Sequence, residues 1–148
     1  MSLETKITTD LKTAMKAKDK VSLRGIRAIK SALMLLKTDG NATEIDEKTE
    51  IALLQKLVKQ RRESLSIYKE QNREELAEKE REEIAIIEKY LPAQLDEAAL
   101  ETIVKEIIAK TGADSMKDMG KVMGMASKQL AGQADGKAIS AVVKKLLG

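Results

Sequence analysis

A single proline, Pro92, interrupts this chain of 148 residues. Proline breaks helix interiors, so its scarcity leaves long stretches free to be helical. Apolar residues recur at the three- and four-residue spacing of one helix face, and no stretch alternates apolar and polar residues as a half-buried strand does. Hydrophobic residues make up 43% and charged residues 34%, a balance typical of packed helical proteins rather than disordered ones. We therefore predict an all-α protein.

Pro92 also predicts a domain boundary. The residue before a proline is pushed out of helical geometry, so a helix should end at Leu91. The composition changes after this point, because six of the eight glycines follow residue 111. We expect an N-terminal helical domain of about four helices over residues 1–92 and a C-terminal three-helix bundle over residues 93–148.

Polar side chains predict where the helices begin and end. An Asp or Ser just before an apolar stripe accepts a hydrogen bond from the first helical turn. The predicted caps are Ser2, Asp19, Ser115, with Asp118 at its capping-box position, and Asp135. Two further helices are expected to begin at about Asp46 and at Asp96. The predicted stops are Asp39-Gly40-Asn41, Gln71-Asn72 and Gly112. The expected inward residues include Ile7, Leu11, Ala14, Met15, Ile26, Ile29, Leu33, Leu36, Ile51, Leu54, Val58, Leu65, Ile84, Ile87 and Leu91, and then Leu100, Ile103, Val104, Ile107, Ile108, Met119, Val122, Met123, Ala126, Leu130, Ile139, Val142, Val143, Leu146 and Leu147.

The chain contains no cysteine and no histidine. Disulfides, zinc fingers, thiol nucleophiles and histidine acid–base pairs are therefore excluded.

The longest apolar run, Ala32 to Leu36, is too short for a membrane span, and the first residues lack the pattern of a signal peptide. We expect a cytoplasmic protein with no membrane partner, no cofactor, no metal and no catalytic residue. A metal site at Glu74, Glu78 and Glu82 is a weaker interpretation than a solvated acidic face.

Charge is unevenly distributed, although the formal net charge is only +3. Residues 1–37 carry nine basic and three acidic residues, whereas residues 70–88 carry eight acidic and three basic residues. This pattern indicates either a surface for a polyanion or two faces that neutralise each other. Lys20, Arg24 and Arg27 share one predicted helix face.

Tyr68 and Tyr90 are the only aromatic residues, so the chain cannot build a platform on which nucleic-acid bases stack. A nucleic acid would therefore be recognised by its backbone and its shape.

The most unusual pattern lies in the second helix of the C-terminal domain. At 100° per residue, Lys117, Lys121 and Lys128 fall within about 40° of one another, and Gly124 lies between Lys121 and Lys128. A helical glycine costs about 1 kcal/mol relative to alanine. Close helix packing would explain Gly120. Gly124, flanked by lysines, indicates a surface that a phosphate backbone approaches closely.

The next turn adds polar backbone groups. Gly132 and Gly136 permit positive φ, Asp135 caps the last helix, and Lys137 lies beside its free N–H groups. The pattern Gly-x-x-Asp-Gly-Lys lacks the spacing and the Ser or Thr of a nucleotide-binding phosphate loop. A nucleotide hydrolase is therefore rejected.

The stretch Asp118-Met119-Gly120-Lys121-Val122-Met123-Gly124, followed by Gly132 and Asp135-Gly136-Lys137, resembles the YqeY-like family. It is also similar to the tail domain of GatB, the B subunit of the amidotransferase that corrects misacylated Glu-tRNA or Asp-tRNA. Tyr90-Leu91-Pro92-x-x-Leu95 resembles the same family. The likeness to YqeY-like proteins covers the whole chain. The likeness to GatB covers chiefly the residues from about 93 onward, with a looser helical likeness before it. The resemblance implies a helical domain followed by a three-helix bundle, which in GatB packs on the outer elbow of tRNA.

The resemblance implies tRNA contacts at Lys121, Gly124, Gly136 and Lys137, with Gly120 and Asp135 structural. Together with the lysine face, the candidate RNA-binding residues are Lys117, Lys121, Gly124, Lys128, Gly136 and Lys137. The expected partners are tRNA or another structured RNA and an aminoacylation or amidation enzyme.

Two alternatives stay open. One is a protein-interaction adaptor, since Met116, Met119, Met123 and Met125 suit an adaptable surface. The other is a carbon–nitrogen ligase using glutamine as amide donor, which descriptions of the family imply. The residues do not support catalysis, because the chain lacks the GatB catalytic cradle and a Ser-Ser-Lys glutaminase site.

Overall fold

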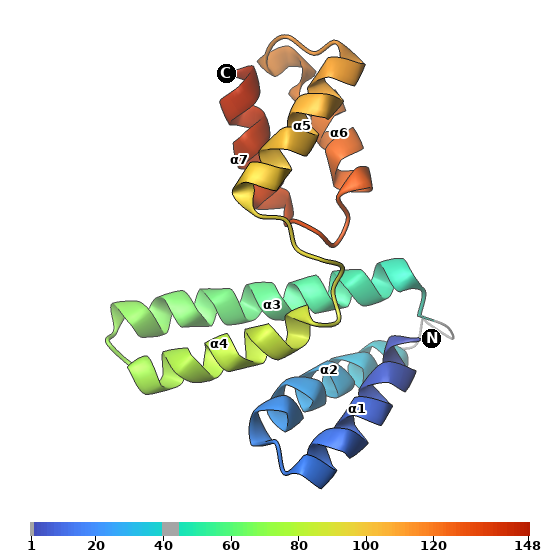
Figure 1. The fold of residues 1–148 in the computed structure, drawn as a ribbon, viewed down its shortest axis with the longest axis vertical. Helices are drawn as coiled ribbons and strands as arrows, with labels where there is room; N and C mark the ends of the chain where they lie inside the picture. Colours follow the sequence, from blue (N-terminus) through green and yellow to red (C-terminus); the bar gives the residue numbers. More distant parts are fainter. Residues whose placement is uncertain (1, 40–44) are drawn as a thin grey trace. The chain divides into compact units, whose positions relative to one another are not determined.

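The computed structural model describes residues 2–39 and 45–148. These residues form seven α-helices, one short 3-10 helix and no strand, so the all-α prediction is confirmed. The chain divides into two compact units, Met1–Leu91 and Pro92–Gly148. The first holds α1 (Leu3–Ala17), α2 (Lys20–Thr38), α3 (Glu47–Glu70) and α4 (Glu74–Glu88), and the second holds α5 (Glu97–Thr111), the 3-10 helix η1 (Met116–Asp118), α6 (Met119–Gln129) and α7 (Gly136–Leu147) (Figure 1).

Three of the four predicted caps, and the predicted helix starts at Asp46 and Asp96, are confirmed by hydrogen bonds. The side chains of Ser2, Asp19, Asp46, Asp96 and Asp135 each accept from the backbone N–H three residues later, at 2.7–3.2 Å. Gly112 ends α5 with a φ of +69°, and Asn72 follows α3 with a φ of +56°. α2 ends at Thr38, and the predicted stop residues Gly40 and Asn41 lie outside the described residues.

The predicted cap at Ser115 is wrong. Its side chain makes no capping hydrogen bond, and the chain first forms η1. The carboxylate of Asp118 instead accepts from the backbone N–H of Asp114 at 3.2 Å. α6 consequently begins at Met119, after the 3-10 turn rather than directly after Ser115.

The core of the first unit lies where α2 packs against α1 and α4, and α4 packs along α3. Its buried members are Leu3, Ile7, Ala14, Ile26, Ile29, Leu33, Leu54, Val58, Ile84, Ile86 and Ile87. Gly25 is buried at the crossing of α2 and α4, where a Cβ atom would lie 2.6 Å from Cβ of Ile86. Met15, which the pattern placed inward, is instead 56% exposed, so that prediction is wrong.

α4 ends three residues earlier than predicted. Beyond Glu88, the backbone N–H groups of Lys89, Tyr90 and Leu91 donate to the carbonyl three residues back, at 3.0–3.3 Å. The Tyr90 hydroxyl then donates to the Asp10 carboxylate on α1 at 2.5 Å. This hydrogen bond ties the end of α4 to α1.

Tyr90→Phe should destabilise the first unit by about 1 kcal/mol, the usual contribution of one hydrogen bond. Burial, and then the hydrogen bond to Asp10, raise the pKa of the Tyr90 phenol above its usual value near 10. The folded state therefore favours the protonated phenol, and this stability is complete below pH 10 and lost as pH rises through the folded pKa. Urea unfolding at pH 8 and pH 11 should show the difference between wild type and variant shrinking at pH 11. An undiminished difference would contradict this account.

The second unit has its own core between α5, α6 and α7, built from Leu100, Val104, Ile107, Val122, Ala126, Leu130, Ile139, Val142 and Val143. The segment before α5 is bonded to the turn between α6 and α7. The Leu95 N–H donates to the Gln133 carbonyl at 2.9 Å, and Nε2 of Gln94 donates to the Gly132 carbonyl at 2.5 Å. Gly132 in this turn is buried and has a φ of +80°. The two hydrogen bonds therefore hold the backbone of the turn against the segment before α5.

Candidate nucleic-acid interface

α6 has one buried face and one exposed face of unusual composition. Val122 and Ala126 point into the core and are 0% exposed. The exposed residues of the helix are Gly120, Lys121, Gly124, Met125, Ser127, Lys128 and Gln129. The segment 119–134 contains no acidic residue. The outward side of α6 is therefore a cationic surface without carboxylates of its own.

The glycines of this surface face open space. A Cβ atom built on Gly120, Gly124 or Gly136 meets no heavy atom within 4 Å. The interpretation of Gly120 as a packing glycine is therefore wrong, because no described part of the chain approaches it. α6 contains two glycines, each of which costs up to about 1 kcal/mol relative to alanine in a helix interior, without a packing contact inside the chain.

The candidate lysines carry uncompensated charge. Lys117, Lys121, Lys128 and Lys137 are exposed, and within residues 2–39 and 45–148 none of them forms an ion pair. The nearest acids in sequence, Asp118 and Asp135, accept backbone N–H bonds. In contrast, Lys105 and Lys145 of the same unit share the carboxylate of Glu101 at 3.4 Å.

The structure brings some of the predicted residues together and separates others. Lys121, Gly124 and Lys128 lie on one continuous helix at i, i+3 and i+7, which places them on one face. Lys117 lies in η1, so the helical wheel used in the sequence prediction does not extend to it. Gly136 and Lys137 open α7, directly after the turn that follows α6, and Gly136 has no positive φ.

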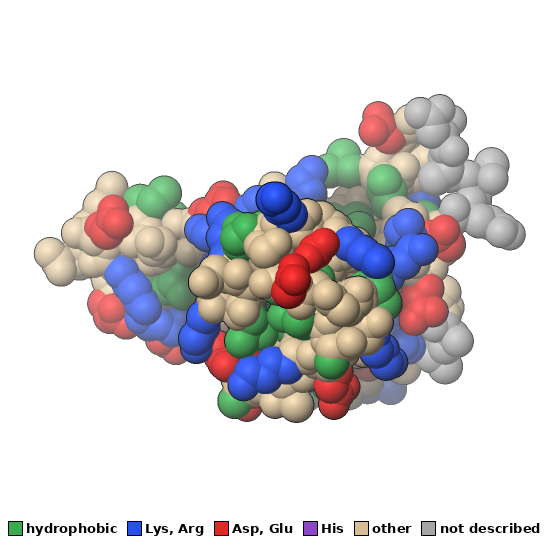
Figure 2. Space-filling view, turned by 90° about the horizontal axis from the view of Figure 1, so that it is seen from above, with side chains coloured by type: hydrophobic (Ala, Val, Ile, Leu, Met, Phe, Trp, Pro, Cys, Tyr) green, Lys and Arg blue, Asp and Glu red, His purple; other side chains and the backbone are tan. Residues whose placement is uncertain are grey.

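The number of positive side chains alone does not distinguish the α6 surface from the rest of the protein surface. Figure 2 shows Lys and Arg side chains spread over the visible face and interleaved with Asp and Glu. The distinguishing features of the α6 surface are the exposed glycines and the absence of carboxylates along 119–134.

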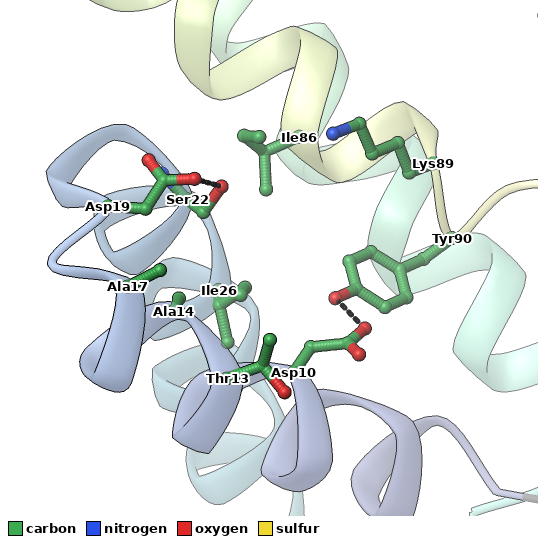
Figure 3. Close-up of a pocket in the computed structure, with 10 residues that line it drawn as sticks. All are labelled: Asp10, Thr13, Ala14, Ala17, Asp19, Ser22, Ile26, Ile86, Lys89 and Tyr90. Carbon is green, nitrogen blue, oxygen red and sulfur yellow. Dashed lines mark hydrogen bonds between the residues drawn. The ribbon is translucent and has the colours of Figure 1, made fainter.

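A second feature, a shallow cleft in the first unit, escaped the sequence prediction. It has a volume of about 220 Å³. Its lining comes from α1, α2 and the end of α4, and consists of Asp10, Thr13, Ala14, Ala17, Asp19, Ser22, Ile26, Ile86, Lys89 and Tyr90 (Figure 3). The lining comes from two segments that are far apart in sequence, 10–26 and 86–90, so no local pattern brings them together.

Four of the six polar side chains that line the cleft form hydrogen bonds in two pairs. Tyr90 donates to Asp10, and the Ser22 hydroxyl donates to Asp19 at 2.6 Å (Figure 3). Burial, and then the hydrogen bond to Asp10, raise the pKa of Tyr90, so its hydroxyl stays protonated near neutral pH. The volume is also below the roughly 300–1,000 Å³ of most ligand pockets. We therefore interpret the cleft as a packing gap between α1, α2 and the end of α4 rather than as a ligand site.

The acidic residues considered for a metal are engaged with arginines. Glu74 and Glu78 both pair with Arg81, at 2.6 and 2.9 Å, and Glu82 pairs with Arg24 at 3.0 Å. Within the described part of the chain, no group of three or more acidic residues is arranged to hold a metal ion.

Comparison with known proteins identifies the family. The sequence profile described as "Yqey-like protein" matches residues 4–147. The chain belongs to the YqeY-like family. This confirms the resemblance to the YqeY-like family that was drawn from the glycine–lysine motifs.

The curated relatives of this YqeY-like chain carry the name "Altered inheritance of mitochondria protein 41, mitochondrial". The protein from Vanderwaltozyma polyspora is 36% identical over 117 residues, which cover 74% of this chain and 63% of the relative. The protein from Kluyveromyces lactis is 37% identical over 84 residues, 57% of this chain and 45% of the relative. The protein from Pyrenophora tritici-repentis is 26% identical over 147 residues, 97% of this chain and 80% of the relative. The chain thus spans less than two thirds of the first two relatives.

The prediction of a cytoplasmic location is contradicted by these relatives, which are named as mitochondrial proteins. The prediction rested on missing cysteines and missing apolar segments, and neither feature separates one aqueous compartment from another. Across residues 2–39 and 45–148, no helix has the length and apolar character needed to cross a bilayer.

Proposed function

We propose that this YqeY-like protein is a binding module for tRNA or another structured RNA, and that the exposed face of α6 and the start of α7 hold the RNA. The supporting observation is the α6 surface, where Gly124 exposes bare backbone between the unpaired Lys121 and Lys128. No contact within the described chain accounts for Gly120 and Gly124. A partner that approaches the helix backbone closely would account for both.

The chemistry of this surface fits a phosphate backbone. Lysine binds phosphate as a flexible point charge and reads no sequence. Without side chains at positions 120 and 124, a sugar–phosphate strand could approach the helix closely. Tyr68 and Tyr90 both belong to the first unit, so the second unit contains no aromatic side chain for base stacking. Recognition would rest on the shape of the RNA and on phosphate contacts.

The resemblance to the GatB tail favours tRNA among structured RNAs. It also suggests an aminoacylation or amidation enzyme as the protein partner. Such a partner would supply the chemistry, because the chain lacks the catalytic cradle of GatB.

The proposal is tested by fluorescence anisotropy of the full chain with labelled total tRNA. The variant Lys121→Glu/Lys137→Glu should bind at least about tenfold more weakly, because each phosphate contact releases counterions and is worth about one unit of the log–log salt slope. Lys110→Glu/Lys144→Glu is the matched control, since it changes the same charge at exposed lysines elsewhere in the unit. Binding that does not respond to salt, or equal losses in both variants, would contradict the proposal.

The adaptor alternative is supported by two exposed methionines. Met116 is 45% exposed and Met125, which lies on α6 beside Lys121, is 40% exposed. Methionine suits a protein contact that adapts to its partner. This function would be favoured by one protein that copurifies at equal stoichiometry, resists ribonuclease treatment and is lost in Met125→Lys.

A further inference from the structure

The first unit also carries exposed cations, and many of them lie on α2. α2 contains five basic residues and no acidic residue. Two of the five are neutralised, because Arg24 pairs with Glu82 at 3.0 Å and Lys37 pairs with Glu4. The sequence prediction grouped Arg24 with Lys20 and Arg27, but its pairing with α4 removes it from that face. Three cations of α2 therefore stay unpaired within the described residues: Lys20, Arg27 and Lys30.

α1 and the loop to α2 add further unpaired cations. Lys6, Lys12, Lys16 and Lys18 are exposed, and in the described part of the chain they form no ion pair. The three acidic residues of this hairpin are already engaged. Glu4 pairs with Lys37, Asp10 accepts from Tyr90, and Asp19 accepts from Ser22. Seven cations of the hairpin thus face solvent without a carboxylate partner.

We propose that the outer surface of the α1–α2 hairpin binds RNA phosphates and gives the chain a second RNA contact. We call this the hairpin cationic surface, and define it by Lys12, Lys16, Lys20, Arg27 and Lys30. The inference rests on the proposed RNA-binding function, and extends it to the first unit. The resemblance to the GatB tail, which covers chiefly the residues from about 93 onward, implies tRNA contacts in the second unit and none at these residues.

The composition of this surface favours RNA over a membrane. A helix that lies on a bilayer inserts an apolar face among the lipid tails. In α2 that face is already used, because Ile26, Ile29 and Leu33 are buried in the core. Among the described residues of the hairpin, the exposed large apolar side chains are Met15, Met34 and Leu35, too few to form an inserting stripe.

The composition also favours RNA over an acidic protein. Lysine is depleted from protein–protein interfaces, whereas arginine and aromatic residues are enriched there. Six of the seven unpaired cations are lysines, and the hairpin contains no aromatic residue. Flexible lysines without aromatic anchors match a hydrated phosphate backbone.

Two contacts on one RNA would act together. When one unit is bound, the short connection between the units keeps the other at a high effective concentration near the same RNA. The salt slope of the full chain should therefore include phosphate contacts from both units. Each lost contact should lower that slope by about 1.

The test compares two double variants of the first unit in the tRNA anisotropy assay across a salt series. Arg27→Glu/Lys30→Glu changes the hairpin cationic surface. Lys56→Glu/Lys59→Glu makes the same charge change at exposed, unpaired lysines on α3. The hairpin variant should bind at least about tenfold more weakly with a slope lower by about 2, while the α3 variant should stay within about twofold of wild type.

The outcomes separate this inference from the proposed function. If the hairpin variant matches the α3 variant while Lys121→Glu/Lys137→Glu loses binding, the second contact is overturned and the α6 interface stands. If wild type does not bind tRNA at any salt, both are overturned. If the hairpin variant loses only its affinity for phosphatidylserine vesicles, the surface serves a membrane instead. Circular dichroism checks that each variant keeps its helix content. The neutral variant Arg27→Gln/Lys30→Gln should lose less tRNA affinity than the Glu variant, because it removes two positive charges without adding negative ones.

Discussion

Gly25→Ala should destabilise the first unit by about 2 kcal/mol, although alanine is the better helix former. The added Cβ would lie 2.5 Å from Cγ2 and 2.6 Å from Cβ of Ile86. Cβ of Ile86 is attached to the α4 backbone, so the helices must separate to make room. For a unit of this size, the loss should lower the melting temperature by roughly 10 °C.

Gly124→Ala provides the matched control, because the same methyl group at a helical glycine of α6 meets nothing within 4 Å. Thermal and urea unfolding of both variants should show opposite signs, with Gly124→Ala stabilising the second unit by up to about 1 kcal/mol. A Gly25→Ala variant as stable as wild type would mean that α2 and α4 do not cross closely at this point.

Gly124→Leu should separate stability from RNA binding. Leucine is a good helix former, and the site is open, so the second unit should become more stable by up to about 1 kcal/mol. A leucine side chain between Lys121 and Lys128 should keep a phosphate backbone away from the helix. Affinity for tRNA should fall at least about tenfold, while the lysine charges are unchanged.

Ala109→Leu is the control for this experiment, because Ala109 is an exposed residue on α5 outside the α6 surface. It should leave tRNA affinity within about twofold of wild type. If Gly124→Leu binds tRNA as tightly as Ala109→Leu does, the bare backbone at position 124 has no role in binding.

Local chemistry explains why most helices could be predicted from the sequence. Asp19, Asp46, Asp96 and Asp135 each cap a helix through a bond to a residue three positions later, and such a contact depends on a few neighbouring residues. Ser115 failed as a cap because the backbone N–H of Asp118, the donor that the cap would use, donates instead to the Ser115 carbonyl at 3.0 Å and closes the 3-10 turn.

Contacts between distant segments could not be predicted. Ile86 was absent from the expected core, yet it is buried because Gly25, on another helix, leaves space for it. Likewise, Tyr90 and Asp10 lie 80 positions apart and meet only when α4 packs near α1. Gly120 was expected to pack against a helix, and only the structure showed that the site is open.

The candidate interface was predictable in part. The spacing of Lys121, Gly124 and Lys128 placed them on one face, since a regular helix fixes that geometry. Lys117 could not be placed by the same rule, because a 3-10 helix turns by a different angle per residue. The pairing of Arg24 with Glu82 was also invisible in the sequence, and it decides which cations of α2 are left for a partner.

The central claim, that RNA lies on the α6 surface, is tested most directly by lysine footprinting. The full chain is acetylated with and without saturating tRNA at low salt, and the modified lysines are quantified by mass spectrometry. The account predicts strong protection of Lys121, Lys128 and Lys137, with Lys110 and Lys144 of the same unit still reactive. Protection of Lys110 and Lys144 while Lys121 and Lys128 stay fully reactive would contradict it.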